Sequence, residues 1–262
     1  MQNIKEYVAT KKEELKNRIL KSEKKPKLAI VQVNDDVASN AYIRGKIKDL
    51  SEIGAEYEHI ILPTNTSEEE LVNLVHKLNE KEDVTGIIVQ MPLPVQINEE
   101  RIKIEVNPKK DVDGFNPLSK FNPATPFGIV TFLSDNNFDF KGKNALVIGR
   151  SNIVGRPMAK LLLDKDMNVT VIHSKTSEED KKRFIENADL IIVAVGKRYY
   201  LKNEFNFKKG AIVIDVGINR DINNKLAGDC EPELSVKYQT PVPGGVGLLT
   251  RLALLINLME TI

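Results

Sequence analysis

The stretch ALVIGRSNIVGRPMAKLLL, residues 145–163, decides the fold that this sequence predicts. It joins a short apolar strand to an amphipathic helix through a turn that contains Gly149, Ser151 and Gly155. In doubly wound sheets, the free N–H groups at such a helix N-terminus bind the pyrophosphate of a dinucleotide. The spacing is G-x-S-x-x-x-G rather than G-x-G-x-x-G, so a βα turn without a ligand is an equal alternative on pattern alone.

The strand after this helix indicates which dinucleotide would bind. NAD-binding folds place an acidic residue about 20 positions after the glycines, where it binds the ribose 2′-OH. Here the strand expected at 168–172 is closely followed by Ser174 and Lys175 rather than by an acid, and Arg150 lies beside the first glycine. A hydroxyl and two cations suit a 2′-phosphate, so the sequence favours NADP over NAD. Cations that merely face solvent are the alternative.

Strand and helix patterns alternate on both sides of the turn. Apolar runs predict strands at residues 27–33, 57–62, 86–90, 145–149, 168–172, 190–195 and 211–217. Helical periodicity separates most of these runs, with an N-cap at Ser67 and a C-cap at Gly54. Such alternation predicts an α/β fold in which parallel sheets carry helices on their faces.

The turn-rich loop PKKDVDGFNP (108–117) marks a boundary between two lobes. We therefore predict two α/β domains, residues 1–117 and 118–246, of which the second is doubly wound and Rossmann-like. The apolar residues of the last helix, 247–262, must pack against a surface, and we expect this helix to complete the first domain. The active site is expected in a cleft between the lobes.

The composition bounds the possible partners. Among 262 residues, 38 Lys and Arg oppose 37 Asp and Glu, and the resulting charge of +1 indicates neither nucleic acid nor an anionic membrane. One cysteine, Cys230, and three histidines cannot form a four-ligand zinc site, so no metal is expected. The apolar runs are far shorter than a membrane span, and the charged N-terminal helix lacks the features of a targeting peptide. We expect a cytoplasmic protein with a small-molecule substrate.

Several stretches together resemble one family, the bifunctional methylenetetrahydrofolate dehydrogenase/cyclohydrolases. The matching stretches, in family order over nearly the whole chain, are DDVASNAYIRGKIK (35–48), GIIVQMPLP (86–94), KDVDGFNP (110–117), PATPFG (123–128), VIGRSNIVGRPM (147–158), ADLIIVAVGK (188–197), IDVGINR (214–220) and TPVPGGVGLLT (240–250). The resemblance implies NADP-linked oxidation of 5,10-methylenetetrahydrofolate to the methenyl form and its hydrolysis to 10-formyltetrahydrofolate. These reactions belong to one-carbon metabolism and serve purine biosynthesis. The first lobe would bind folate and the second NADP.

Helical spacing leaves two candidate pairs on the helix predicted at 41–53. The apolar stripe of this helix comprises Ile43, Ile47 and Leu50. Tyr42 and Lys46 share one flank at its rim, and Arg44 and Lys48 share the other. The resemblance places the family's Tyr-x-x-x-Lys pattern on Tyr42 and Lys46. It implies that the lysine handles protons in the hydrolysis, that the tyrosine ring stacks on folate, and that Arg44 and Lys48 face solvent.

Three further polar residues are expected near this lysine. Gln90 ends a predicted strand, at the edge where open sheets bind ligands, and taken alone it is better explained as a strand-end residue that hydrogen-bonds a loop. In the family this glutamine contacts the lysine. A neutral amide leaves the lysine free to lose its proton, which a carboxylate would oppose. Asp113 matches the family's pterin-binding aspartate, although Asp111 competes from sequence alone and a plain turn role is the alternative. Ser39 is either a local N-cap or a residue on the substrate side.

The remaining expected contacts lie in loops. Pro241, Pro243, Gly244 and Gly245 would shape a loop that lets the backbone approach the substrate. The expected cofactor-binding residues are Gly149, Arg150, Ser151, Gly155, Ser174, Lys175 and Ile218. The chain departs from the family at Leu248, where proline is usual, and at Ala124 and Asn34. Leu248 is expected to affect the start of the last helix, but no departure removes a proposed catalytic group.

Three alternative functions share part of this pattern. A monofunctional dehydrogenase would accumulate the methenyl product, and a shikimate-type NADP dehydrogenase would share only the dinucleotide lobe. A non-catalytic NADP-binding module would show no turnover. The joint presence of four residues argues against this function: Tyr42, Lys46, Gln90 and Asp113. The family also implies a homodimer formed through the NADP lobe.

Overall fold

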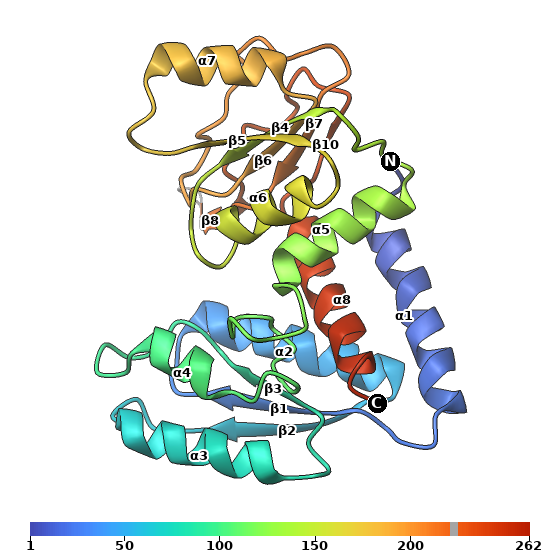
Figure 1. Cartoon of the computed structure of the whole chain (residues 1–262), viewed down its shortest axis with the longest axis vertical. Coiled ribbons are helices and arrows are strands. Elements are labelled where there is room, and N and C mark those ends of the chain that lie inside the picture. The colour runs from blue at the N-terminus through green and yellow to red at the C-terminus, as the bar shows by residue number, and fades with distance from the viewer. Residues whose placement is uncertain (221–224) are drawn as a thin grey trace. The chain divides into compact units, whose positions relative to one another are not determined.

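The computed structural model of this chain describes residues 1–220 and 225–262 (Figure 1). The chain forms two compact units, each with its own parallel sheet, which confirms the predicted α/β class with two domains. The three-stranded unit consists of Val8–Ala124 and Arg251–Ile262, and the five-stranded unit consists of Met1–Tyr7 and Thr125–Thr250. The boundaries near the chain ends fall inside helices α1 (Ile4–Lys21) and α8 (Val246–Met259).

The three-stranded unit orders its strands β2-β1-β3, all parallel. Its elements are β1 (Lys27–Gln32), α2 (Val37–Ile53), β2 (Glu56–Ile61), α3 (Glu68–Glu80), β3 (Gly86–Val89) and α4 (Glu99–Glu105). Leu71 and Val75 of α3 and Ile102 of α4 pack with Val31 and Val89 in one buried cluster, so both helices cover the same face of the sheet. Helix α4 was not predicted, because its 7 residues complete only about two turns.

Local sequence sets the ends of these helices. The predicted N-cap at Ser67 is confirmed, and Glu70 completes a reciprocal capping box with it at the start of α3. Gly54 ends α2 in the left-handed conformation with φ 81°, as predicted. The N-cap role considered for Ser39 is wrong. Helix α2 begins at Val37, and the Asp36 carboxylate accepts the Ser39 N–H at 2.7 Å, so Asp36 is the cap and Ser39 lies in the first turn.

The five-stranded unit orders its strands β10-β7-β6-β4-β5, again all parallel. Its elements are α5 (Ala124–Asp135), β4 (Asn144–Ile148), α6 (Gly155–Leu163), β5 (Asn168–Ile172), α7 (Glu178–Asn187), β6 (Leu190–Val193), β7 (Ile212–Asp215) and β10 (Tyr238–Gln239). A short antiparallel ribbon joins β8 (Asn219–Arg220) to β9 (Leu226–Ala227). Strands β8, β9 and β10 were not predicted, because two residues show no alternation.

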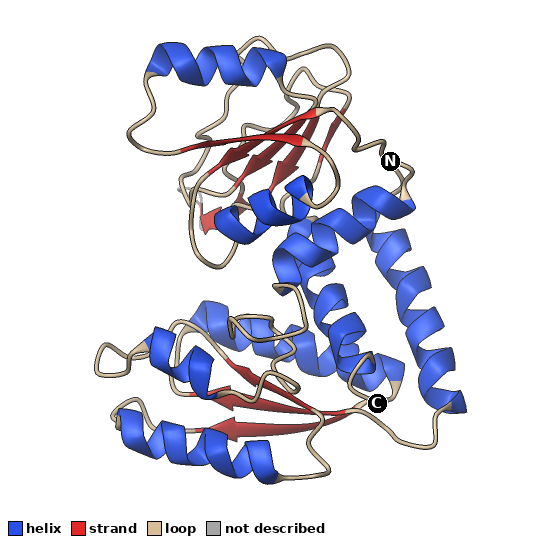
Figure 2. Cartoon of the chain, viewed as in Figure 1, coloured by secondary structure: helices blue, strands red, loops and turns tan. Residues whose placement is uncertain are grey.

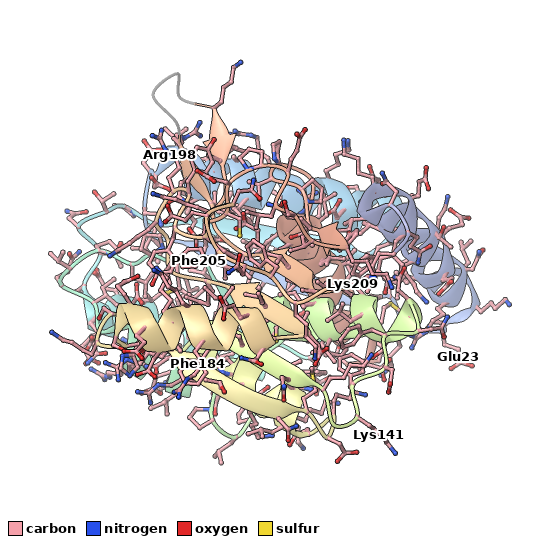
Figure 3. All side chains as sticks on the ribbon, turned by 90° about the horizontal axis from the view of Figure 1, so that it is seen from above. Glu23, Lys141, Phe184, Arg198, Phe205 and Lys209 are labelled. Atoms are coloured by element: carbon pink, nitrogen blue, oxygen red, sulfur yellow. The ribbon has the colours of Figure 1, made fainter. Side chains whose placement is uncertain are left out.

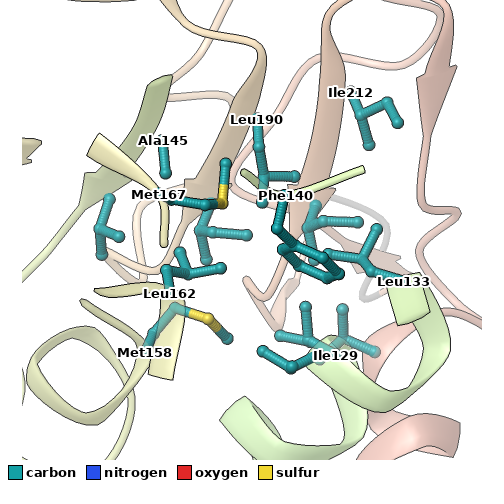
Figure 4. Close-up of a cluster of buried hydrophobic side chains, with 14 residues drawn as sticks. Ile129, Leu133, Phe140, Ala145, Met158, Leu162, Met167, Leu190 and Ile212 are labelled. Carbon is teal, nitrogen blue, oxygen red and sulfur yellow. The ribbon is translucent and has the colours of Figure 1, made fainter. Parts of the chain in front are cut away.

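Helices cover both faces of the five-stranded sheet, with α7 on one side and α5 and α6 on the other (Figure 2). On the second side, Ile129, Leu133, Met158 and Leu162 pack against strand residues such as Leu190 (Figure 4). Every residue of β6 and β7 is buried, which explains their uninterrupted apolar sequences. In the described part of the chain, no helix combines the length and apolar character needed to cross a membrane.

Candidate active site

The geometry of the three-stranded unit distinguishes the two flanks of α2 that sequence periodicity could not. Lys46 is buried, with 8% of its surface exposed, and is not at a helix rim. Its Nζ donates to Gln90 Oε1 at 3.1 Å, and the Gln90 amide in turn donates to the Met91 carbonyl at 2.8 Å. The second bond fixes which end of the Gln90 amide faces Lys46. Lys48 is 77% exposed and lies 3.8 Å from Glu52, so it is a solvated cation, and Arg44 is likewise exposed.

The electrostatics of this buried group favour a lysine that exchanges its proton. Burial lowers the pKa of Lys46, and the charge of Asp113 partly opposes this shift. Burial also raises the pKa of Asp113, which Lys46 opposes. Gln90 adds an acceptor without adding charge, so it orients the ammonium group and does not raise the pKa as a carboxylate would. The lysine therefore holds its proton less firmly than an exposed lysine does.

Asp111 and Asp113 have different surroundings, although one residue separates them. The Asp111 carboxylate, 4% exposed, accepts the Asn116 N–H at 2.7 Å and so closes the turn that Gly114 makes with φ 71°. Burial raises the pKa of Asp111 to about 6. Asp111 and Asp113 both line one small pocket with Met91 and Phe115, but within the described residues the Asp113 carboxylate accepts no hydrogen bond. Asp111 is thus a structural residue, and Asp113 is available to a ligand.

Helix α8 brings Arg251 to α2, a contact that the sequence reading missed. Arg251 Nε lies 2.9 Å from the buried carboxylate of Asp49, which also pairs with Lys12. The guanidinium crosses α2 at Gly45, where any Cβ would collide with it. Burial raises the pKa of the Tyr42 phenol, and the Arg251 charge opposes that shift. The detectable signal was Gly45 itself, since glycine inside a helix costs about 1 kcal/mol relative to alanine and needs a packing reason.

A hydrogen bond links the loop after β1 to the loop that follows β3 and Gln90. Asn34 Nδ2 donates to the Pro92 carbonyl at 2.6 Å, and the buried Ser39 Oγ lies 3.5 Å from the Met91 carbonyl. The Met91–Pro92 peptide bond is cis. Asn34, one of the departures from the family pattern, therefore fastens the loop that continues from Gln90. Ser39 contributes to the same junction rather than to the helix cap.

In the five-stranded unit, the glycine turn has the close packing that dinucleotide binding requires. Gly149 has φ 116°, and a Cβ there would collide with the Ala194 carbonyl; a Cβ on Gly155 would collide with the Gly149 carbonyl. Ser151 Oγ accepts the N–H groups of Val154 and Gly155 at 3.2 and 3.4 Å and so organises the start of α6. The two glycines bring the backbone close to its neighbours at the start of α6, which fits the approach of a pyrophosphate.

The candidate 2′-phosphate residues gather next to this turn. Strands β4 and β5 pair in register up to Ile148 and Ile172, and the Gly149 N–H donates to the Ile172 carbonyl at 3.0 Å. Arg150, Ser174 and Lys175 therefore follow adjacent strand ends, and all three are exposed. Within the described residues, neither cation forms an ion pair. Ile218, which is 51% exposed, follows β7 two strands away from β4.

The loop at 241–245 is a compact turn at the start of α8. The Val242–Pro243 peptide bond is cis, and Gly244 has φ 93°. A Cβ on Gly245 would collide with the Pro241 carbonyl, so this position accepts only glycine. Helix α8 begins at Val246, and the Leu248 N–H bonds to the Gly245 carbonyl at 3.0 Å, so leucine continues the helix where the family usually has proline.

Comparison with known proteins gives consistent matches over both units. A sequence profile described as "Tetrahydrofolate dehydrogenase/cyclohydrolase, catalytic domain" matches residues 2–113, and one described as "Tetrahydrofolate dehydrogenase/cyclohydrolase, NAD(P)-binding domain" matches residues 123–262. A relative from Streptococcus uberis, "Bifunctional protein FolD", is 45% identical over 237 residues, which make up 86% of this chain and 82% of the relative.

Two solved structures extend this similarity to the fold. The FolD methylenetetrahydrofolate dehydrogenase/cyclohydrolase from Campylobacter jejuni is 40% identical, with a TM-score of 0.95 over 99% of this chain and 96% of its own. The methylenetetrahydrofolate dehydrogenase-cyclohydrolase from Trypanosoma brucei, complexed with NADP cofactor and inhibitor, is 29% identical, with a TM-score of 0.93 over 100% of this chain and 96% of its own.

Proposed function

Because the chain belongs to the tetrahydrofolate dehydrogenase/cyclohydrolase family, we propose that its two units divide the binding of folate and of NADP between them, as described below. The protein is a bifunctional, NADP-dependent enzyme. It oxidises 5,10-methylenetetrahydrofolate to 5,10-methenyltetrahydrofolate and hydrolyses the methenyl form to 10-formyltetrahydrofolate. In our assignment, the three-stranded unit binds folate and the five-stranded unit binds NADP.

Lys46 is assigned the proton transfers of the hydrolysis. Water adds to the cationic methenyl carbon and loses both of its protons as the formyl carbonyl forms; one proton reaches the ring nitrogen as the C–N bond breaks, and the other is released. Burial lowers the pKa of Lys46 toward the range in which it both accepts and returns a proton. A cationic methenyl group beside the lysine lowers that pKa further. The observation that carries this assignment is the hydrogen bond from buried Lys46 to the neutral amide of Gln90.

Binding of the folate is assigned first to residues of the three-stranded unit, which contains Lys46. The Asp113 carboxylate accepts two N–H donors of the pterin, since none of the described residues occupies its oxygens. The Tyr42 ring stacks on the folate from the position one turn before Lys46 on α2. Ser39 and the loop of Pro243, Gly244 and Gly245 complete the substrate-side residues.

For the oxidation, the protein's main task is to place the nicotinamide ring of NADP beside the methylene carbon of the folate. NADP supplies a nicotinamide ring that accepts a hydride, and the methylene carbon of the folate loses that hydride to become methenyl. The protein binds the dinucleotide through the turn at Gly149, Ser151 and Gly155 and through Ile218. Arg150, Ser174 and Lys175 neutralise and hydrogen-bond the 2′-phosphate. The oxidation needs no side chain to accept a proton, because loss of the hydride gives the methenyl cation without releasing a proton.

A single assay tests this function. The purified chain is given 5,10-methylenetetrahydrofolate and NADP, while NADPH formation and the near-ultraviolet absorbance of the methenyl form are followed together. We expect NADPH to form without lasting accumulation of the methenyl form. Persistent methenyl absorbance would identify a monofunctional dehydrogenase, and the absence of NADPH would exclude the proposed oxidation.

We further propose that two copies associate and that the enzyme works in the cytoplasm, where 10-formyltetrahydrofolate supplies purine biosynthesis. Strand β5 is an edge of the five-stranded sheet, and its Val171 is 39% exposed, so a second copy is the proposed occupant of that edge. Light scattering after size-exclusion chromatography tests this point. A monomeric mass at micromolar concentration would contradict it, and substitution of Val171 by lysine is expected to shift a dimer toward monomer.

A further inference from the structure

Two buried carboxylates of the five-stranded unit take no part in the chemistry described above. Asp215 ends β7 and is 2% exposed, and Asp229 follows β9 and has no exposed surface. Buried carboxylates of this kind require hydrogen-bond donors, because an unpaired buried charge is strongly unfavourable. The donors they use show what these residues hold in place.

Four donors from two loops converge on Asp229. Its Oδ2 accepts the N–H groups of Val195 and Gly196 at 2.7 and 2.9 Å, and its Oδ1 accepts the Lys197 N–H at 2.8 Å. Oδ1 also accepts the side-chain amide of Asn219 at 2.9 Å. Three successive backbone N–H groups form a concavity that favours an anion. Asp229 fills it and joins the loop after β6 to the loop after β7.

Asp215 in turn fixes the position of Asp229. Its Oδ1 accepts the N–H groups of Gly217 and Asp229, each at 2.9 Å, and its Oδ2 accepts the Cys230 N–H at 2.9 Å. A Cβ on Gly217 would collide with the Asp229 carboxylate, and a Cβ on Gly228 would collide with that of Asp215. The two carboxylates are therefore closely packed, and their hydrogen bonds hold both loops in place. Arg198, which follows the first loop, is labelled in Figure 3.

These loops lie where the nicotinamide half of the dinucleotide must extend. The sheet order is β10-β7-β6-β4-β5, the glycine turn follows β4, and the residues assigned to the 2′-phosphate follow β5. A dinucleotide with its adenosine phosphate at β5 and its pyrophosphate at β4 continues toward the carboxyl ends of β6 and β7. The Ala194 carbonyl already packs against Gly149, so the β6 loop adjoins the glycine turn.

We propose that Asp229 is a positioning residue for the nicotinamide half of NADP, acting through the loops that it joins, at Val195–Lys197 and at Ile218–Asn219. The proposal rests on the assignment of NADP to the five-stranded unit. Asp229 itself does not touch the cofactor. It holds the exposed Ile218 and the β6 loop backbone in the positions that receive the ring.

The test compares three variants of the full chain. Asp229→Asn keeps the shape but turns one acceptor oxygen into a donor that faces N–H groups. Asn219→Ala removes only the tether from the β7 loop. Asp189→Asn is the matched control, because the Asp189 carboxylate also accepts a backbone N–H, that of Asn144 at 3.0 Å, but at the amino end of the sheet.

NADP affinity is measured by calorimetry, and the hydrolysis of supplied methenyltetrahydrofolate, which needs no NADP, is measured in the same preparations. Asp229→Asn is expected to weaken NADP binding at least about tenfold, and Asn219→Ala about threefold, because charge-assisted hydrogen bonds are lost. Both variants should keep the hydrolysis rate within about twofold, and Asp189→Asn should change neither quantity.

Unchanged NADP affinity in Asp229→Asn or in Asn219→Ala would overturn the proposal. A parallel loss of hydrolysis and NADP binding in Asn219→Ala, the milder variant, would also overturn it by showing a general structural role. If Asp229→Asn does not fold, Asn219→Ala alone decides. The wild-type chain is measured first, so that a failure to bind NADP at all refutes the proposed function rather than the role of Asp229.

Discussion

The two candidate sites of this chain differ in how far their charged groups are buried. Around Lys46, a buried cation lies near a half-buried amide and a half-buried carboxylate, and burial shifts the pKa of both ionisable groups toward their neutral forms. Around Arg150, Ser174 and Lys175, the charged and polar groups are exposed. The first arrangement suits a group that changes its protonation state during a reaction, and the second suits a group that only attracts a fixed charge.

If the proposed assignments hold, burial rather than residue type distinguishes the proton-transferring lysine from the phosphate-binding lysine. Lys46 and Lys175 are both lysines, yet Lys46 is buried and burial lowers its pKa, whereas Lys175 is exposed. A phosphate site gains from exposed cations because they need not be desolvated before the ligand arrives. Substitutions in the two places should therefore differ in their dependence on pH and on salt.

Lys46→Met is expected to give the largest effect. Methionine keeps the apolar stem of the side chain and removes the proton-transferring group, so hydrolysis of methenyltetrahydrofolate should fall by about 10²- to 10⁴-fold. NADP affinity should not change. The decay of methenyl absorbance measures the first quantity and calorimetry the second.

The matched control is Lys48→Met, since Lys48 lies on the same helix but is 77% exposed. It should retain wild-type hydrolysis. Wild-type hydrolysis by Lys46→Met would show that Lys46 does not transfer the proton, and the proposed difference between the two sites would then be wrong.

Gln90→Glu is expected to be the next largest and tests the sign of the pKa argument. A carboxylate at this position would lie about 3 Å from Lys46 Nζ and raise the lysine pKa, opposite to the effect of burial. Each unit of increase reduces the neutral fraction about tenfold, so hydrolysis at neutral pH should fall about ten- to a hundredfold. The rate should recover at higher pH.

The pH–rate profile distinguishes this explanation from simple damage. Gln90→Met removes the same hydrogen bond without adding charge, and it should lower the rate without moving the limb of the profile to higher pH. If Gln90→Glu also leaves the limb in place, the neutral amide has no electrostatic role.

Arg150→Ala is expected to have a smaller effect, confined to one cofactor. Loss of a charge-assisted contact to the 2′-phosphate should weaken NADP about tenfold and leave NAD unchanged. Because Arg150 is exposed, the difference should shrink as salt is added, unlike the effect of Lys46→Met. Lys160→Ala, which removes an exposed cation of α6 paired with Asp164 at 2.9 Å, is the control. Equal weakening of NADP and NAD would refute the 2′-phosphate assignment.

Sequence patterns predicted the repeated strands and the long helices because each of these elements is long enough to show its period. Helix α4 and the two-residue strands are not, and only tertiary contacts define them. The sequence also did not show that Lys46 is buried. Tyr42 and Lys46 are four residues apart, and so are Arg44 and Lys48, so helical spacing does not distinguish the two lysines. The pairing of Asp49 with Arg251 joins residues about two hundred positions apart, which no local pattern encodes.

Asp111→Asn is expected to give the smallest effect and to show that burial alone does not make a residue catalytic. Burial raises the Asp111 pKa to about 6, above the value of ~3.9 in an unfolded chain. The folded state therefore binds the proton more tightly, so this contribution to stability is complete below pH ~4 and is lost as pH rises through about 6. Asparagine stays neutral and still offers an oxygen to the Asn116 N–H.

At pH ~7.5 the variant should be about 1 kcal/mol more stable than the wild type, and near pH ~4 the advantage should disappear. Urea unfolding at these two pH values measures the difference, and both enzymatic rates should remain within about twofold of wild type because the Asp111 carboxylate is already bonded to the Asn116 N–H of its own turn. A variant that is less stable at both pH values would mean that the charge of Asp111 is favourable in the fold. The distinction between Asp111 as structural and Asp113 as ligand-binding would then lose its physical basis.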